Sequence, residues 1–164
     1  RRQRQMCIRD RAYGGNDSDF DWASIAADPE GDHRPRTELP EFLSKLKQTV
    51  TELARVGVQP VLMTLPPIDG ARYLDYICRG GLSRDSIMRW LGDVGCIYRY
   101  QELYSDTVAS FAMREGLPLI DVRRRFLPQR DLPELISADG IHLTMPGYRQ
   151  LFDTLAQWVV PQLA

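Results

Sequence analysis

The sequence predicts an α/β fold in which a parallel sheet is flanked by helices. Two short apolar runs, residues 60–65 and 117–122, indicate strands. Runs that are apolar at nearly every position are typical of strands covered on both faces, as in a parallel sheet. Helical patterns precede, separate and follow the two runs. The order helix–strand–helix–strand–helix therefore favours a sheet with helices packed against it.

The first elements follow a turn at residues 14–17. Residues 18–36 are polar and carry prolines and a glycine, which predicts a surface loop with a short helix over residues 22–27. Thr37 is expected to cap the next helix, which has Pro40 in its first turn and ends at Gly57. Its apolar positions repeat at helical spacing: Phe42, Leu43, Leu46, Val50, Leu53 and Ala54.

Three helices are predicted between the strands. They cover residues 71–79, a stretch capped by Ser83 that runs through residue 90, and residues 97–115. The last of them is expected to bury Leu103, Val108, Phe111 and Ala112.

After the second strand, the arginines at 123–125 are expected to end the strand in solvent. The final helix is predicted over residues 146–158, with one apolar side formed by Tyr148, Leu151, Phe152 and Leu155.

Composition narrows the classes of function. The 164 residues fit one domain, and 21 Lys and Arg against 22 Asp and Glu give no overall field that favours nucleic acid. No apolar run approaches the roughly 20 residues of a membrane span. Three cysteines without a CxxC pair indicate free thiols in a reducing, cytoplasmic compartment. The alternating acids Asp17, Asp19 and Asp21 lack the glycine and glutamate of a calcium loop, so we expect no metal.

Asp139 and His142 are the strongest candidates for chemistry. An imidazole accepts a proton from a hydroxyl efficiently only when a neighbouring group fixes its tautomer and orientation. Asp139 lies three positions before His142 on a turn that contains Gly140. This spacing allows the carboxylate to orient one ring nitrogen and leave the other as a base. The alternative is a structural pair that holds the final helix.

The sequence Gly-Gly-Asn-Asp at residues 14–17 is the second candidate. Glycines such as Gly15 allow close approach of the backbone. The side-chain amide of Asn16 could donate a hydrogen bond to a developing oxyanion, an interaction worth about 2.7–4 kcal/mol. The alternative is an ordinary turn, because glycine and asparagine are the usual turn residues.

The two motifs together resemble the SGNH (GDSL-type) esterase and acylhydrolase family. The turn at residues 14–17 looks like the family's third block, and residues 139–143 match its fifth block. The resemblance implies a flavodoxin-like three-layer α/β/α fold with a parallel sheet. It also implies that His142 is the general base, that Asp139 orients it, and that Asn16 and Gly15 belong to the oxyanion and substrate site.

The sequence departs from this family at the nucleophile. The family's first block, a Gly-Asp-Ser turn, has no counterpart, and none of the serines has that context; Ser18 is nearest to the oxyanion turn. Residues 1–11 are basic, non-periodic and unlike the rest of the sequence, and we interpret them as a non-native or disordered tail. Residues 12–164 are interpreted as the C-terminal two-thirds of one SGNH hydrolase domain whose first strands are missing. We expect this fragment to be inactive.

The resemblance implies serine-dependent ester hydrolysis through an acyl-enzyme in the parent protein, with no cofactor. The substrate class would be a small-molecule or carbohydrate ester. Two alternatives stay open: a non-catalytic binding or structural domain, and an acyltransferase on the same scaffold. Neither a nucleic-acid partner nor a membrane span is expected, and the oligomeric state is not predicted.

Overall fold

The computed structural model describes residues 14–162 and has a two-stranded parallel sheet at its centre. Strand β1 (Leu62–Met63) pairs with β2 (Leu119–Ile120), Leu62 opposite Leu119 and Met63 opposite Ile120. The predicted α/β class and parallel pairing are confirmed, but both strands are shorter than predicted. Pro60, Pro66 and Pro118 flank them and have no N–H to donate to a ladder. The predicted tail at residues 1–11 lies outside the described residues.

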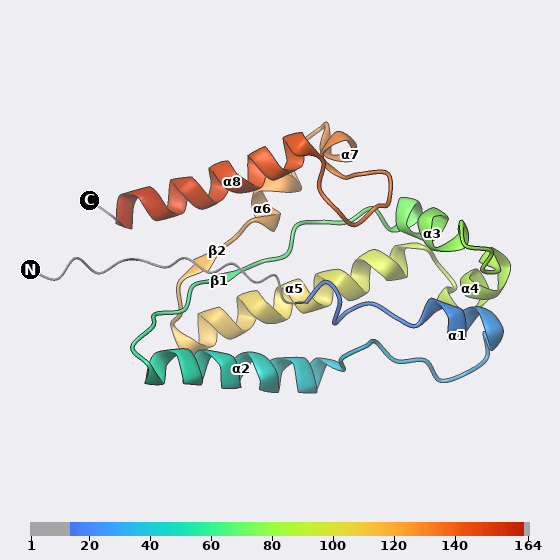
Figure 1. Cartoon of the computed structure of the whole chain (residues 1–164), viewed down its shortest axis with the longest axis horizontal. Helices are drawn as coiled ribbons and strands as arrows, with labels where there is room; N and C mark the ends of the chain where they lie inside the picture. Colours follow the sequence, from blue (N-terminus) through green and yellow to red (C-terminus); the bar gives the residue numbers. More distant parts are fainter. Residues whose placement is uncertain (1–13, 163–164) are drawn as a thin grey trace, which may run out of the picture.

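Helices cover both faces of the sheet (Figure 1). Helix α5 (Gly95–Glu115) packs against one face, with α2 (Leu39–Arg55) beside it. Helix α8 (Met145–Val159) packs on the other face, next to β2. Successive strand residues point to opposite faces. Leu62 and Leu119 accordingly join the α5 side, and Met63 and Ile120 join the α8 side.

A second core lies at one end of the molecule, between three short helices (Figure 1). These are α1 (Trp22–Ala27), α3 (Gly70–Cys78) and α4 (Arg84–Leu91). Asp21, Asp69 and Ser83 cap them, because each side chain accepts a hydrogen bond from a backbone N–H in the first turn. The predicted helices at residues 22–27, 71–79 and 83–90 are confirmed within about a residue.

The start of α2 differs from the prediction. Its N-cap is Glu38 instead of Thr37. The backbone of Thr37 is bonded elsewhere: its N–H donates to the carbonyl of Asp17, and its carbonyl accepts from the hydroxyl of Tyr104. These two long-range bonds hold Thr37 in the preceding loop. Gly57, at φ +75°, follows the last turn of α2 as predicted.

The arginines after β2 form a short helix, α6 (Arg123–Phe126), and the expectation that all three lie in solvent is wrong for Arg123. Only 7 % of Arg123 is exposed. Its guanidinium donates to Ser105, Tyr98 and Gln101 on α5, and its backbone N–H donates to Thr64. Arg123 therefore ties the end of β2 to α5 and to the end of β1.

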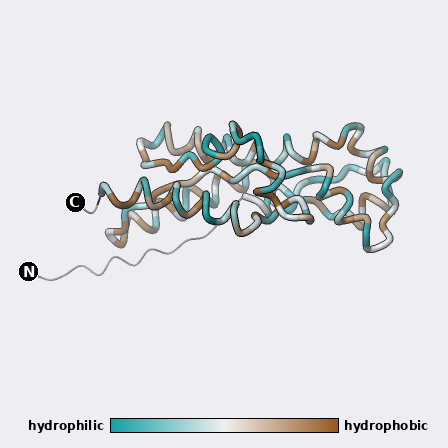
Figure 2. The backbone as a smooth tube through the Cα atoms, turned by 90° about the horizontal axis from the view of Figure 1, so that it is seen from above, coloured by the Kyte–Doolittle hydropathy of each residue, from teal (hydrophilic) through white to brown (hydrophobic). Residues whose placement is uncertain are grey.

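Two predicted apolar sides were also partly wrong. Val108, Phe111 and Ala112 of α5 are buried as expected, but Leu103 is exposed. On α8, Leu151 and Leu155 pack in the core with Trp158, whereas Tyr148 and Phe152 are exposed. Along the helices, apolar and polar stretches alternate, as in helices with one buried side (Figure 2). The periodicity of apolar residues predicted both helices correctly, but their buried sides are narrower than predicted.

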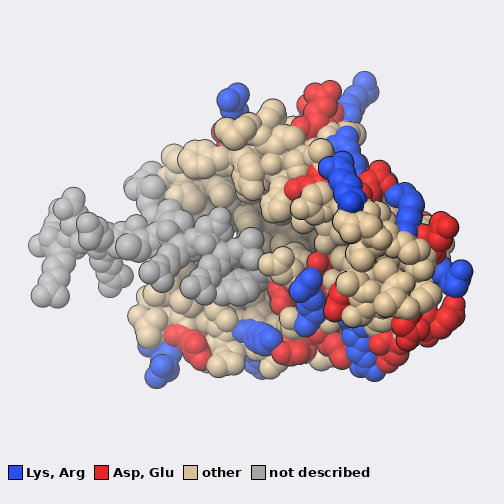
Figure 3. Space-filling view, turned by 45° about the vertical axis from the view of Figure 1, so that its right-hand side comes forward, with Lys and Arg blue, Asp and Glu red and all other residues tan. Residues whose placement is uncertain are grey.

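The remaining elements are α7 (Leu132–Leu135) and a final 3₁₀ turn, η1 (Val160–Gln162). Charges of both signs are mixed on the face drawn in Figure 3, and neither sign covers a continuous area there. None of the helices in residues 14–162 has an apolar stretch of the length that a membrane crossing requires.

Replacing Arg123 by methionine should destabilise the fold by roughly 2–4 kcal/mol, because the oxygens of buried Gln101 and Ser105 and of half-buried Tyr98 lose their donor. The matched control is Arg124→Met, which removes an exposed neighbour and should change stability by less than about 0.5 kcal/mol. Urea unfolding of both variants measures the difference. Equal stability of the two would contradict the structural role of Arg123.

Candidate active site

Asp139 and His142 lie on a closed loop between α7 and α8. An antiparallel bridge between Ile136 and Leu143 joins the two ends of the loop. Inside it, the N–H of Ser137 donates to the carbonyl of His142 at 2.8 Å, and the N–H of Gly140 donates to the carbonyl of Ser137 at 3.0 Å. These bonds bring the two candidate residues together, as their spacing predicted.

The two carboxylate oxygens of Asp139 have different hydrogen-bond partners. Oδ1 accepts from the hydroxyl of Ser137 at 2.5 Å and from the backbone N–H groups of Ile141 and His142, each at 3.0 Å. Oδ2 lies 2.7 Å from Nδ1 of the His142 ring. One oxygen therefore builds the turn, and the other is directed at the imidazole.

The environment favours the charged form of Asp139. Partial burial acts to raise the pKa of this carboxyl. The hydrogen bonds from the His142 backbone, the Ser137 hydroxyl, the His142 ring and the Ile141 backbone outweigh burial and hold the pKa well below its usual range. Asp139 is thus an anion at neutral pH and can accept a hydrogen bond from an N–H of the His142 ring.

The His142 ring projects into solvent with 67 % of its side chain exposed. Because Asp139 carries no proton, Nδ1 is assigned as the N–H donor in this pair, which leaves the lone pair on Nε2. Nε2 makes no hydrogen bond with any residue in the range 14–162. The geometry is that of an oriented imidazole whose basic nitrogen is accessible.

The N-terminal turn of helix α3 packs against this loop at Gly140. The N–H of Asp69 donates to the carbonyl of Gly140 at 2.8 Å. Gly140 has φ +80°, and a Cβ there would overlap the carbonyl oxygen of Asp69 and the backbone nitrogen of Tyr73. Only glycine allows both this conformation and this approach.

The Gly-Gly-Asn-Asp turn is a separate, well-bonded unit. The Asp17 carboxylate accepts from the N–H of Gly14 at 2.9 Å, and the Ser18 hydroxyl donates to the carbonyl of Gly15 at 3.0 Å. Gly15 and Asn16 are exposed. The structure thus leaves the Asn16 amide accessible, but it shows no contact between Asn16 and the Asp139–His142 pair.

The turn and the pair are both attached to the segment that follows β1. Gly14 lies against the side chain of Leu65, near the end of β1. Asp19, just after the turn, accepts a 3.0 Å hydrogen bond from the hydroxyl of Tyr73, whose backbone supports Gly140. This segment leaves the carboxyl end of the sheet, where ligands bind in α/β folds.

All serines of the chain lie in the described part, and none of their hydroxyls is hydrogen-bonded to the His142 ring in this structure. Ser18, the one nearest to the Asn16 turn, is buried and bonded to a backbone carbonyl. Ser137 is the serine nearest to the pair, but its hydroxyl is directed at Asp139 instead of the ring.

Three residues that shape the site were not predicted as site residues: Ser137, Asp69 and Arg72. Ser137 carried a weak signal, since a serine two positions before an aspartate on a turn often bonds it. Asp69 and Arg72 carried none, because their contacts with residues 133–140 are long-range.

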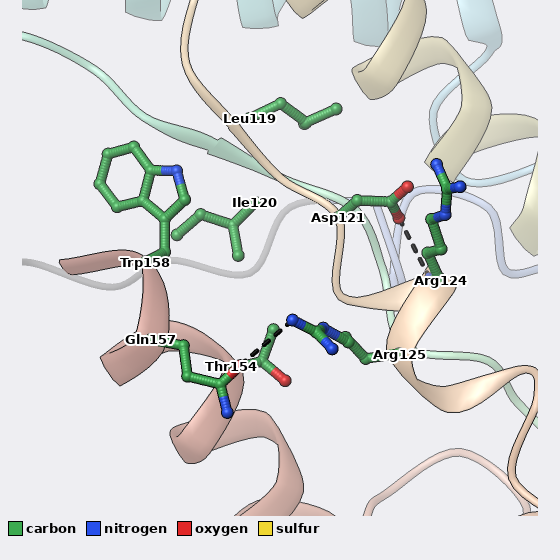
Figure 4. Close-up of a pocket in the computed structure, with 8 residues that line it drawn as sticks. All are labelled: Leu119, Ile120, Asp121, Arg124, Arg125, Thr154, Gln157 and Trp158. Atoms are coloured by element: carbon green, nitrogen blue, oxygen red, sulfur yellow. Dashed lines mark hydrogen bonds between the residues drawn. The ribbon is translucent and has the colours of Figure 1, made fainter. Parts of the chain in front are cut away.

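A hollow of about 470 Å³ lies elsewhere, between β2, α6 and α8 (Figure 4). The Arg125 side chain points across it and donates to Gln157 at 3.1 Å, and Trp158 and Ile120 form an apolar wall. Neither Asp139 nor His142 lines this hollow, so it is separate from the candidate catalytic pair.

The acids considered for a calcium loop have other partners. Asp17 bonds the Gly14 backbone, Asp19 accepts from Trp22 and Tyr73, and Asp21 caps α1. Within residues 14–162, no three His, Cys, Asp or Glu side chains are grouped so that they could hold a metal.

The fold is similar to that of a solved protein, a lipase/acylhydrolase from Enterococcus faecalis. The TM-score is 0.58 at 19 % sequence identity, and the match covers 91 % of this chain and 58 % of that chain. No family model matches the sequence, nor does any curated protein. The predicted acylhydrolase-type α/β fold is thus confirmed. The chain spans less than two-thirds of the length of the enzyme whose fold it shares.

Gly140→Ala should destabilise the fold by roughly 2–4 kcal/mol, the sum of left-handed strain and overlap with the α3 backbone. Gly57→Ala is the matched control: φ is +75°, but nothing lies near its Cβ, so only about 1 kcal/mol of strain is expected. Thermal or urea unfolding of both variants gives the difference. A Gly140 variant no less stable than the Gly57 variant would contradict the packing of the loop on α3.

The lowered pKa of Asp139 predicts an acid-sensitive contribution to stability. Because the carboxyl is more acidic in the folded than in the unfolded chain, this contribution is fully present above an unfolded-state pKa of about 3.9. It is lost progressively as the pH falls from there towards the native pKa. Asp139→Asn should flatten the decline of unfolding free energy between about pH 5 and 2.

Asp106→Asn serves as the control for this titration, because Asp106 is exposed on α5 and accepts no hydrogen bond from another described residue. We expect it to keep the wild-type decline. The same acid slope in wild type and Asp139→Asn would show that the carboxylate contributes nothing to folding.

Proposed function

We propose that the chain carries the histidine and aspartate of the catalytic triad of a serine-type ester hydrolase, an acylhydrolase that works through an acyl-enzyme. His142 is the general base, Asp139 orients it, and Asn16 together with the backbone at Gly15 belongs to the oxyanion and substrate site. The observation that carries the proposal is the 2.7 Å contact between Asp139 Oδ2 and His142 Nδ1, in a ring whose side chain is 67 % exposed.

The proposed chemistry has two half-reactions. Nε2 of His142 takes the proton of a serine hydroxyl as the serine oxygen attacks the ester carbonyl carbon. The intermediate collapses, the C–O bond to the alcohol breaks, and the imidazolium returns the proton to the departing oxygen. Water then repeats the sequence on the acyl-enzyme and releases the carboxylic acid. Asp139 stabilises the imidazolium in both steps and stays ionised.

The exposure of the imidazole favours a catalytic over a purely structural role. The turn needs the Asp139 carboxylate and the backbone N–H of His142, which donates to Oδ1. It does not need the ring, since the exposed ring covers no core residue. A structural pair would be expected to bury both partners, because exposed ion pairs contribute only about 0–1 kcal/mol.

The nucleophile is proposed to come from a residue that is not among these 164. This inference is supported by the geometry of Ser18 and Ser137, whose hydroxyls are bonded to Gly15 and Asp139. The similar lipase/acylhydrolase extends well beyond the matched part, since 58 % of its length is covered. The complete site would then combine the described loop with a serine-bearing turn at the same end of the sheet.

The test is to express the longest reading frame at the native locus that contains residues 14–162, beside this chain, and to assay both on p-nitrophenyl acetate. We expect activity in the longer protein and none above background in the chain, since loss of the nucleophile in a comparable hydrolase costs about a million-fold in turnover. Activity of the chain itself would contradict the proposed origin of the nucleophile.

His142→Ala in the active protein separates the two roles of the pair. Alanine keeps the backbone N–H that bonds Asp139, so the unfolding free energy should change by less than about 0.5 kcal/mol. Hydrolysis should fall by a factor of about 10⁴ or more. If His142→Ala retains hydrolysis, or if it greatly lowers the unfolding free energy, Asp139 and His142 form a structural pair. Product analysis with a competing alcohol would reveal an acyltransferase.

A further inference from the structure

Helix α7 ends directly before the loop that holds Asp139, and its last carbonyls have no partner inside the helix. The final four carbonyls of any helix lack an intrahelical donor. The N–H that would serve Pro133 in a continuing helix belongs to Ser137, but this N–H donates to His142 instead. When the loop closes, the carbonyls at the end of α7 must therefore find donors outside the helix, in other residues or in water.

Two residues supply these donors. Thr144, which also caps α8, donates its hydroxyl to the carbonyl of Glu134 at 2.8 Å and its N–H to the carbonyl of Leu135 at 2.9 Å. Arg72 supplies the remaining two: NH1 donates to the carbonyls of Pro133 at 2.6 Å and Ile136 at 2.9 Å. The four carbonyls from Pro133 to Ile136 thus each have a donor.

The guanidinium of Arg72 is itself held in place. Its Nε lies 3.3 Å from Oδ2 of Asp69, one turn earlier on the same helix, and Asp69 Oδ1 caps that turn by accepting from the N–H of Arg72. A guanidinium presents its donors in a rigid planar fork, so one anchored edge fixes the direction of the others. Arg72 is thus a preoriented link from α3 to residues 133–136.

Helix α3 is joined to the loop on both sides of Asp139. Arg72 fixes Ile136, three residues before it, and the N–H of Asp69 fixes Gly140, one residue after it. In Figure 1 the start of α3 lies beside the chain that runs from α7 to α8. Between these two fixed points, Ser137 and the backbone of His142 hold the carboxylate.

We propose that Arg72 is a positioning residue for the general base: by satisfying the end of α7 it frees the Ser137 N–H to close the loop that aligns Asp139 with His142. The proposal rests on the proposed function in that His142 is taken as the base. Arg72 itself contacts main-chain carbonyls and Asp69, and it acts only through the loop.

The first measurement is backbone hydrogen exchange on this chain, which does not depend on activity. Arg72→Met removes the donors but keeps much of the side-chain length. It should speed exchange at Ile141 and His142, whose N–H groups donate to Asp139, by at least about tenfold, the effect of losing one charge-assisted bond from the closed loop. Exchange in the middle of α5 reports global stability.

Arg84→Met is the matched control. Arg84 also forms an ion pair with α3, through Asp75, but it makes no hydrogen bond or ion pair with residues 136–143. It should leave exchange at Ile141 and His142 unchanged. Wild-type exchange in Arg72→Met, or equal acceleration in both variants, would overturn the proposal. If Arg72→Met fails to fold, Arg72→Leu replaces it, because leucine also lacks donors. A folded leucine variant that keeps wild-type exchange at Ile141 and His142 overturns the proposal equally.

The second measurement compares the effects of Arg72→Met on kcat and on KM in the active longer protein. A misaligned base lowers the rate of the chemical step more than substrate binding, so Arg72→Met should reduce kcat about 100-fold and leave KM within about twofold. Unchanged kcat contradicts the positioning role even when His142→Ala is inactive. A loosened loop in a parent protein that has no esterase activity would contradict the proposed function and support the role of Arg72 in the loop.

Discussion

The site depends on one carboxylate that is shared between the backbone and the imidazole. Asp139 uses Oδ1 to gather three donors of its own turn and Oδ2 to meet His142 Nδ1. The donors that build the turn also keep the carboxyl ionised, because they hold its pKa well below the usual range. The same local structure therefore fixes the position of the aspartate and the charge that orients the ring.

This local arrangement is held by parts of the chain that are distant in sequence. Helix α3 begins just after β1, and its first turn bonds the loop at Gly140 and, through Arg72, at Pro133 and Ile136. The buried Arg123 joins the ends of both strands to α5 by hydrogen bonds to Thr64 and Ser105. The position of the imidazole thus depends on the packing of the carboxyl end of the sheet.

Much of the fold could be predicted from the sequence, because its signals were local. Apolar runs gave both strands, and cap residues such as Asp21 and Ser83 lie where the helices begin. The close approach of Asp139 and His142 also followed from their spacing. Long-range hydrogen bonds could not be predicted from the sequence. Nothing near Arg123 or Arg72 in the sequence indicates that these arginines donate to distant carbonyls and hydroxyls. The position of Asn16 relative to the pair is likewise a matter of tertiary structure, and its role in the oxyanion site stays a prediction.

The central claim is that Asp139 fixes one tautomer of His142 and leaves Nε2 as the base. Long-range ¹H–¹⁵N correlation spectra of the histidine side chains, recorded where the ring is neutral, test it most directly. The account predicts a protonated Nδ1 and a bare Nε2 for His142 in the wild-type chain, and loss of this preference in Asp139→Ala. A neutral ring protonated on Nε2 in the wild type would contradict it, because that ring could not accept the proton of a hydroxyl at its exposed nitrogen.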